Sequence, residues 1–396
     1  MRLARDILIA MFGSFLKKPG GKKVVAVADI GSGSAGFAVL EVPAKGPAVV
    51  QVAERAILPI EKRSAEAAIA AIGGELERVG QKMLTTYATK RPGGGHPEML
   101  LCVIRTPWTR AQAVRESKHF GEDTHIVGGM VSELARAALD QASEIDKKGF
   151  LDATVARIEL NGYPTKKPEG KRAHDIEVTA LVSGCDPGIR AAIEHSLETI
   201  LPHTPHTLRS GSRALLTVLR EYAASQDYVI VDMGGEGTTL IAVRDGAPAE
   251  QCLVSEGIYS ILRRLSGVGM PEEVLGVMRM LAHEKCTGPL CEPTEQALAK
   301  IEPELVKIFG EGMAKIASQR RLSNELFLVT HSGMASWLER FFSRIDFTQF
   351  TKTAQPFAVK ALSPESMGAW VKSAPGVFLD CGLATPAALV NIEALS

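Results

Sequence analysis

The sequence contains the same short pattern twice: an apolar strand that ends at Asp-x-Gly and turns through small residues into a second strand. The first copy is DIGSGSAGFAV, which runs from Asp29 to Val39 after the apolar residues VVAVA. The second copy is DMGGEGTTLIAV, which runs from Asp232 to Val243, about 200 residues later. Apolar runs of this kind are typical of strands that are buried on both faces. The repeat therefore favours a chain with two related α/β lobes.

The residues in these turns suit the binding of phosphate and of a metal ion. Small residues allow backbone N–H groups to approach an oxyanion closely. An Asp at a strand end suits Mg²⁺, which prefers oxygen ligands and retains several of its waters. A third unit, THSGMASW, places a small-residue turn before a helix, where it can receive an adenine or ribose edge. The three units together predict a nucleotide held between two phosphate-binding turns.

The order of these units resembles that of the actin-like ATPase superfamily, and within it the bacterial FtsA and PilM proteins, over about residues 23–396. ATVARIELNGYPTKKPEGKRAHDIEVTALVSG resembles the strand pair of the subdomain inserted into FtsA, joined by an Asn-Gly turn and a Pro-x-Gly segment. CGLATPAALVNI resembles the last helix of the lobe. The resemblance implies an α/β, actin-like (ribonuclease H-like) two-lobed ATPase fold with an FtsA-type inserted subdomain. To this the sequence adds a predicted N-terminal amphipathic helix.

The same resemblance implies a domain organisation in which one lobe is interrupted by the insertion. The expected segments are an N-terminal helix and hinge (1–22), the first lobe with the phosphate-one motif (23–106), the inserted FtsA/PilM-type subdomain (107–185), the rest of the first lobe (186–225), the second lobe with the phosphate-two motif (226–256), its helical subdomain (257–320), its continuation with the adenosine motif (321–376), and a closing strand and helix (377–396).

The expected ligands are ATP and Mg²⁺, bound in the cleft between the lobes. Asp29 and Asp232 are predicted to hold the metal through its waters. The candidate phosphate ligands on the first-lobe side are Gly31, Ser32, Gly33 and Ser34. Those on the second-lobe side are Gly234, Gly235 and Thr238. The residues expected to line the adenine are Ser332, Gly333 and Met334.

Several positions depart from the motifs of these families. Ser34 stands where FtsA usually has Lys, and Gly36 stands where PilM tends to have it. Thr239 takes the place of the usual Asp after the phosphate-two Thr, and Gly333 is a single glycine in a turn that is usually Gly-Gly-rich. No residue that positions an attacking water is evident, so the catalytic residues are unknown and we expect a slow ATPase at most.

The resemblance implies an FtsA-like role in cell division: a cytoplasmic adaptor on the inner face of the cell membrane that recruits the tubulin-like protein FtsZ, with self-association into filaments expected. One alternative is a PilM-like cytoplasmic scaffold of a type IV pilus or secretion assembly, which binds a peptide of a pilus inner-membrane protein. A second is a degenerate scaffold that does not hydrolyse ATP. A small-molecule kinase is disfavoured, because the first lobe shows no motif for a catalytic carboxylate or a substrate pocket.

The charge of the chain is unevenly distributed although its formal net value is zero. Residues 1–23 carry six Lys or Arg against one Asp, which leaves 39 basic and 44 acidic residues in the rest. The balanced total argues against nucleic-acid binding through a basic face. No apolar run reaches the roughly 18 residues of a membrane-spanning helix, and we expect the first residues to be retained rather than cleaved as a signal peptide.

Residues 2–18 are predicted to form a helix with an apolar face and a basic flank, which suits binding in a membrane interface. The alternative is that this helix packs on the protein itself or on a partner. The candidate membrane-binding residues are Leu3, Ile7, Leu8, Met11, Phe12, Phe15 and Leu16 on the apolar face and Arg2, Arg5, Lys17 and Lys18 on the flank.

If this segment binds membranes, deletion of residues 1–20 will abolish co-sedimentation of the chain with anionic liposomes. The deletion removes both the apolar face and four basic residues that an acidic surface attracts. Binding of the intact chain should also weaken as salt is added, because the charges are screened. Equal pelleting of the intact and truncated chains would contradict the membrane assignment.

Overall fold

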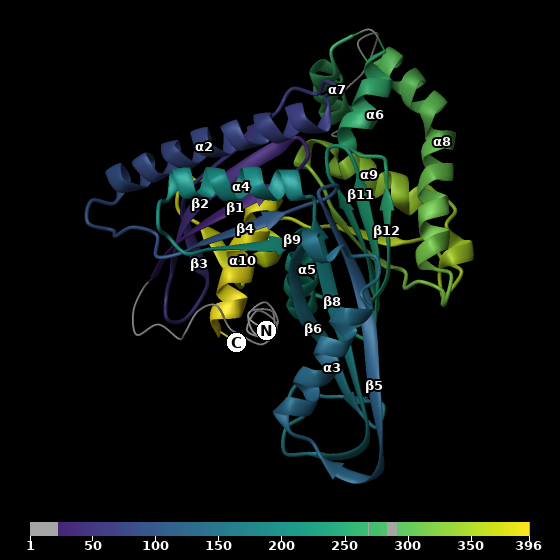
Figure 1. Ribbon diagram of the computed structural model, residues 1–396. Coiled ribbons are helices and arrows are strands. Elements are labelled where there is room, and N and C mark those ends of the chain that lie inside the picture. Colours follow the sequence, from purple (N-terminus) through teal and green to yellow (C-terminus); the bar gives the residue numbers. More distant parts are fainter. Residues whose placement is uncertain (1–22, 268, 283–290, 396) are drawn as a thin grey trace.

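The computed structural model describes residues 23–267, 269–282 and 291–395, and the predicted N-terminal helix lies outside them. The described strands form three sheets (Figure 1). The first, in spatial order, is β15 (Val371–Ser373), β3 (Ala48–Ile57), β2 (Ser34–Val42), β1 (Lys23–Ile30), β4 (Leu100–Ile104) and β9 (His206–Ser210). The second is β12 (Ala247–Val254), β11 (Thr238–Arg244), β10 (Tyr228–Met233), β13 (Glu325–Val329) and β14 (Ala358–Ala361). The third is β5 (Thr109–His125), β8 (Arg172–Cys185), β6 (Phe150–Leu160) and β7 (Tyr163–Pro164).

The helices connect these strands and cover the sheets (Figure 1). Those of the described residues are α2 (Ala65–Lys90), α3 (Gly128–Gln141), α4 (Pro187–Ile200), α5 (Gly211–Tyr222), α6 (Ile258–Ser266), α7 (Pro271–Ala282), α8 (Glu292–Ile316), α9 (Ser332–Arg344) and α10 (Cys381–Leu395), with short 3₁₀ turns at Lys147–Gly149, Thr348–Phe350 and Glu365–Met367. None of these helices is both long and apolar enough to cross a membrane.

The repeated sequence pattern is a repeated structure. In each lobe the Asp-x-Gly strand pairs antiparallel with the strand after it and parallel with a later strand. Asp29 lies opposite Gly36 of β2 and Val103 of β4, and Asp232 lies opposite Thr239 of β11 and Val329 of β13. The two aspartates therefore occupy equivalent positions at the ends of equivalent strands.

One apolar cluster joins the two lobes, and α5 and α10 belong to it. The cluster contains β1 and β2 residues of the first sheet, β10 and β13 residues of the second, and buried residues of both helices. The helix α10 is apolar around most of its circumference, as expected of a helix packed on several sides. Burial of apolar surface between the sheets brings the ends of β1 and β10 to the same region.

The outer faces of the two sheets have separate cores. On the first sheet, α2 and α4 pack over residues such as Phe37 and Leu100. On the second, α6, α8 and α9 supply Ile261, Phe309 and Phe341 to a cluster with several edge-to-face aromatic pairs. Each central strand is therefore covered on both faces, which explains its continuous apolar sequence.

The third sheet and α3 form the inserted subdomain of residues 107–185. The two predicted strands are β6 and β8, which pair antiparallel, and the predicted Asn-Gly turn follows β6 with positive φ angles of 52° at Asn161 and 79° at Gly162. The strand β5, the longest of this sheet, is not among the strands predicted from the sequence. Its outer half is largely exposed and polar, so it lacks the alternation that marks a half-buried strand.

The C-terminal region differs from the predicted boundaries. Residues 377–380, expected to be a strand, form a loop that leads into α10. The strand of this region is β15, which lies inside the segment 321–376 assigned to the second lobe but pairs with β3 of the first sheet. The loop is favoured because the Asp380 carboxylate accepts a hydrogen bond from the Leu383 N–H in the first turn of α10.

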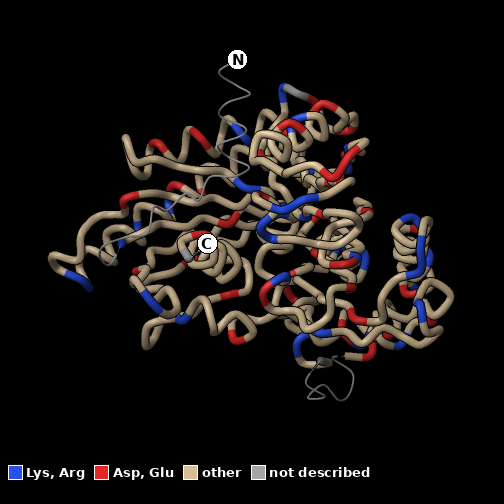
Figure 2. Tube along the Cα trace, turned by 90° about the horizontal axis from the view of Figure 1, so that it is seen from below, with Lys and Arg blue, Asp and Glu red and all other residues tan. Residues whose placement is uncertain are grey.

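Charged residues of both signs are interspersed along the described chain (Figure 2). The described cysteines Cys102, Cys185, Cys252 and Cys381 are free thiols, and Cys291 is disulfide-bonded.

Candidate functional site

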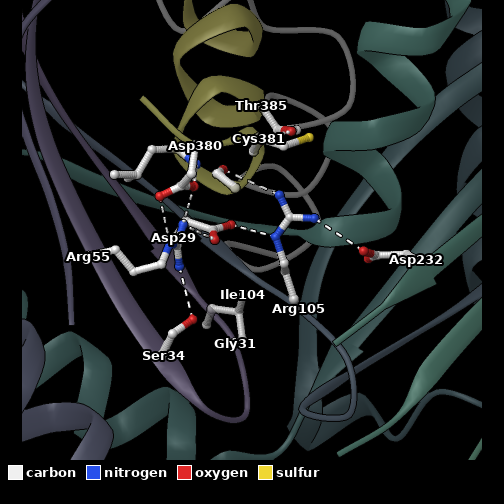
Figure 3. Close-up of polar contacts among 12 residues, drawn as sticks. Asp29, Gly31, Ser34, Arg55, Ile104, Arg105, Asp232, Asp380, Cys381 and Thr385 are labelled. Carbon is white, nitrogen blue, oxygen red and sulfur yellow. Dashed lines mark hydrogen bonds and ion pairs between the residues drawn. The ribbon is translucent and has the colours of Figure 1, made fainter. Parts of the chain in front are cut away.

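The site lies where β1 and β10 end, and two arginines bind the carboxylates there (Figure 3). Arg105 directly follows β4. Its Nε donates to Asp29 Oδ1 at 2.6 Å, and its Nη1 donates to Asp232 Oδ1 at 3.3 Å. Its Nη2 donates to the Gly382 carbonyl at 3.3 Å. One guanidinium therefore contacts both lobes and the start of α10.

The second arginine, Arg55 on β3, acts within the first lobe. Its Nη2 donates to Asp29 Oδ2 at 2.8 Å, and its Nε and Nη2 bind the two oxygens of Asp380 at 2.8 and 2.9 Å. Its Nη1 donates to Ser34 Oγ at 3.0 Å. Both oxygens of Asp29 are thus bound to guanidinium groups, and the predicted phosphate ligand Ser34 is bound through its hydroxyl.

The electrostatics of these groups follow from their burial and from their pairing. Burial alone would lower the pKa of Arg55 and of Arg105, yet neighbouring carboxylates raise the pKa of both residues. The largest of these contributions comes from Asp380 for Arg55 and from Asp29 for Arg105. Burial raises the pKa of Asp232, and Arg105 opposes that effect. Burial also acts to raise the pKa of Asp380, but contacts with Arg55, the Leu383 N–H and Arg105 together outweigh it and leave the pKa lowered. The arginines therefore remain charged and stabilise carboxylates that burial destabilises.

The two predicted phosphate-binding turns contact each other directly. The Glu236 N–H donates to Ser32 Oγ at 2.9 Å, and the Tyr259 hydroxyl donates to the Gly33 carbonyl at 3.0 Å. The Tyr259 ring lies so close that a Cβ added at Gly33 would be 2.1 Å from its Cε2. Ser32 and Gly33 therefore face the second lobe, and Tyr259 from α6 covers the turn.

Backbone groups of the second turn are largely engaged within the second lobe. Gly234 donates its N–H to the Gly237 carbonyl and accepts from the Ile258 N–H, and Gly235 accepts from the Tyr259 N–H at 2.8 Å. The Thr238 hydroxyl, predicted to bind phosphate, donates to the Glu256 carbonyl at 2.6 Å. In the first turn, the Gly31 N–H donates to the Ser34 carbonyl.

The predicted adenosine turn begins α9 and is closed by α7. His331 caps the helix through Nδ1, which accepts from the Gly333 N–H at 3.2 Å. A Cβ at Gly333 would lie 2.6 Å from Arg279 Nε. Met334 is fully buried in the core of the second lobe, while Ser332 is exposed. Of the predicted adenine contacts, Met334 is a packing residue in this arrangement.

The residues present do not fit a magnesium ion in this arrangement. Mg²⁺ requires free carboxylate oxygens and room for several waters. Both oxygens of Asp29, and one oxygen of Asp232, instead lie within hydrogen-bond distance of guanidinium nitrogens. Among the described residues, no cluster of three His, Cys, Asp or Glu side chains is placed to hold a metal. Magnesium binding by Asp29 and Asp232 stays a prediction that requires the arginines to move.

Four residues of the site, Arg55, Arg105, Tyr259 and Asp380, are not among those predicted from the sequence. A signal existed for Arg105, because it is a charged residue directly after the apolar strand LLCVI. Arg105 lies two residues beyond Val103, and His331 lies two residues beyond Val329 in the second lobe. Arg105 and His331 therefore occupy equivalent positions in the repeat. No comparable signal exists for Asp380, which is 325 positions from the Arg55 that it binds.

Comparison with known proteins identifies the fold. No family model matches the chain, and no curated protein matches it either. Among solved structures, the "PilM-PilN type IV pilus biogenesis complex" is 12% identical and matches 94% of this chain and 98% of that chain, with a TM-score of 0.54.

Two further structures match the chain at lower similarity. The ethanolamine utilization protein EutJ from Carboxydothermus hydrogenoformans is 10% identical over 99% of this chain and 97% of its own, with a TM-score of 0.46. A non-polymerising MamK mutant bound to AMPPNP is 9% identical over 93% and 98%, with a TM-score of 0.38. The predicted two-lobed, actin-like α/β fold is confirmed, and at such identities the comparisons show the fold alone.

Replacement of Tyr259 by Phe will weaken the contact between the turns. The variant loses the hydrogen bond to the Gly33 carbonyl, at a cost of about 1 kcal/mol in the free energy of unfolding. Urea denaturation measures the loss. Tyr163→Phe is the matched control, because Tyr163 is 76% exposed, so no measurable change is expected. Equal stability of the two variants would show that the Tyr259 hydroxyl does not hold the turns together.

Proposed function

We propose that this chain is a scaffold with an actin-like fold that neither binds nor hydrolyses ATP and that acts by binding partner proteins. The observation that carries the proposal is the engagement of Asp29 and Asp232 by Arg105. In an ATPase of this fold these two carboxylates would be expected to hold Mg²⁺, and here a side chain of the chain itself lies between them. The direct contact between the two turns supports the same proposal, because Ser32 and Gly33, which were predicted to bind phosphate, are instead engaged with residues of the second lobe.

The partner class that we favour is a peptide of an inner-membrane protein of a pilus or secretion assembly. The fold match to the PilM–PilN complex extends over nearly the whole of both chains and supports this choice. The FtsA-like role, in which the partner is the tubulin-like division protein FtsZ, is the competing proposal. Both proposals place the chain in the cytoplasm at the inner face of the membrane, with the segment 1–22 as the proposed anchor. Both also include self-association of the chain.

Calorimetry with magnesium ATP tests the nucleotide part of the proposal. We expect no binding heat at millimolar nucleotide, because Mg²⁺ and the phosphates would have to displace buried, paired arginines. The protein must be shown to be folded by circular dichroism in the same buffer. Saturable heat, or hydrolysis that Asp232→Asn removes, would overturn the proposal and restore a nucleotide-gated role.

Peptide binding distinguishes the two partner classes. Fluorescence anisotropy compares the cytoplasmic N-terminal tail of an inner-membrane pilus protein with the C-terminal tail of a tubulin-like division protein, both from the source organism. We expect the pilus peptide to bind and the division peptide not to bind. Each peptide with its residue order scrambled serves as a control for non-specific charge attraction. Binding of the division peptide alone would instead support the FtsA-like role.

A further inference from the structure

We infer that Arg105 is a built-in cation of the cleft, which takes the bridging position between Asp29 and Asp232 and fastens the two lobes together. The inference rests on the proposed function in one respect, namely that magnesium nucleotide does not bind there. It goes further because it assigns to the Arg105 side chain the role that a divalent ion would have. It also predicts that removal of this side chain creates an ion site between Asp29 and Asp232.

The contacts of Arg105 have the form expected of such a bridge. Its three guanidinium nitrogens bind three separate parts of the chain: Asp29 at the end of β1, Asp232 at the end of β10, and the Gly382 carbonyl at the start of α10. The planar guanidinium has its donors in a fixed arrangement, so it can orient several oxygens as a coordinated ion does. Figure 3 shows Arg105 between the two aspartates.

The two arginines of the site have different roles. All side chains that bind Arg55 belong to the first lobe or to the loop before α10, which packs on that lobe. Arg105 alone of the two reaches the second lobe. The neighbouring hydroxyls of Thr106 and Thr239 are also hydrogen-bonded across the lobes, directly beside this bridge. Arg105 and the Thr106–Thr239 pair therefore join the two lobes at the strand ends.

The charges around the bridge predict what its removal would produce. Arg105, Asp29 and Asp232 are 7%, 2% and 5% exposed, so water does little to screen them. Without Arg105, Asp29 Oδ1 and Asp232 Oδ1 would each lose their guanidinium partner, while Arg55 would still bind Asp29 Oδ2 and Asp380. The vacated volume next to Asp29 and Asp232 would then contain free carboxylate oxygens, which are hard ligands suited to Mn²⁺ or Mg²⁺.

Mn²⁺ binding to full-length variants, measured by electron paramagnetic resonance, tests the inference. Arg105→Ala should bind Mn²⁺ at least tenfold more tightly than the wild type, and Mn²⁺ should raise its melting temperature. Arg105→Lys retains the cation and should resemble the wild type. Arg105→Ala combined with Asp232→Asn should lose the gained affinity, which identifies the site of the ion.

Arg244→Ala is the matched control for loss of a buried arginine. Arg244 is 8% exposed, but it binds Glu250 and backbone carbonyls within the second lobe. It should gain no Mn²⁺ affinity. If folded Arg105→Ala binds no more Mn²⁺ than this control, the inference is wrong. If Arg105→Ala does not fold, its refolding is compared with and without Mn²⁺, and recovery of the fold only with the ion supports the bridge. The inference is overturned if the variant recovers in neither case and folded Arg105→Gln shows no increase in Mn²⁺ affinity.

The outcomes separate this inference from the proposed function. Binding of magnesium ATP to the wild type would contradict the scaffold proposal, whatever the variants do. Absence of ATP binding to the wild type, together with no gained ion affinity in the variants, would leave the scaffold proposal standing and remove the role assigned to Arg105.

Discussion

The contact between Arg105 and the two aspartates at the strand ends is the interaction on which the arrangement of the lobes depends. An unpaired charge at this depth costs several kcal/mol, so each member of the group requires the others. Asp29 and Asp232 occupy equivalent positions in the two lobes, and Arg105 follows the neighbouring strand β4. The apolar cluster around α5 and α10 brings the sheets together, and the charged contact determines how their ends meet.

The lobes are also connected away from the cleft, through the inserted subdomain. Asp152 of β6 is 1% exposed and accepts from the Ser210 N–H at 3.1 Å, so it fastens the subdomain to the first lobe. The Arg157 guanidinium of the same strand donates to the Asp245 carbonyl in the second lobe. Contacts at the strand ends and contacts through the subdomain therefore both connect the two lobes. A protein held in this way suits a scaffold that presents constant surfaces to partners.

Much of the fold could be predicted because its signals are local. Apolar runs that end at Asp and small residues predicted β1 and β10, and the Asn-Gly pair predicted the turn after β6. The missed elements depend on distant partners. The strand β15 is three residues long and exists through its pairing with β3, and the outer half of β5 is polar because little covers it. In the site, the aspartates were identified and their arginine partners were not.

The sequence by itself determined that two related strand–turn units exist, that each ends in a carboxylate, and that small residues line both turns. These properties follow from residue type and spacing, which act over a few positions. Only the tertiary structure decided what binds the carboxylates. Arg55 and Arg105 meet Asp29, Asp232 and Asp380 across separations of 26 to 325 positions. Such pairing is set by the packing of the two lobes, because a guanidinium has its effect only within a few ångströms of the oxygens it binds.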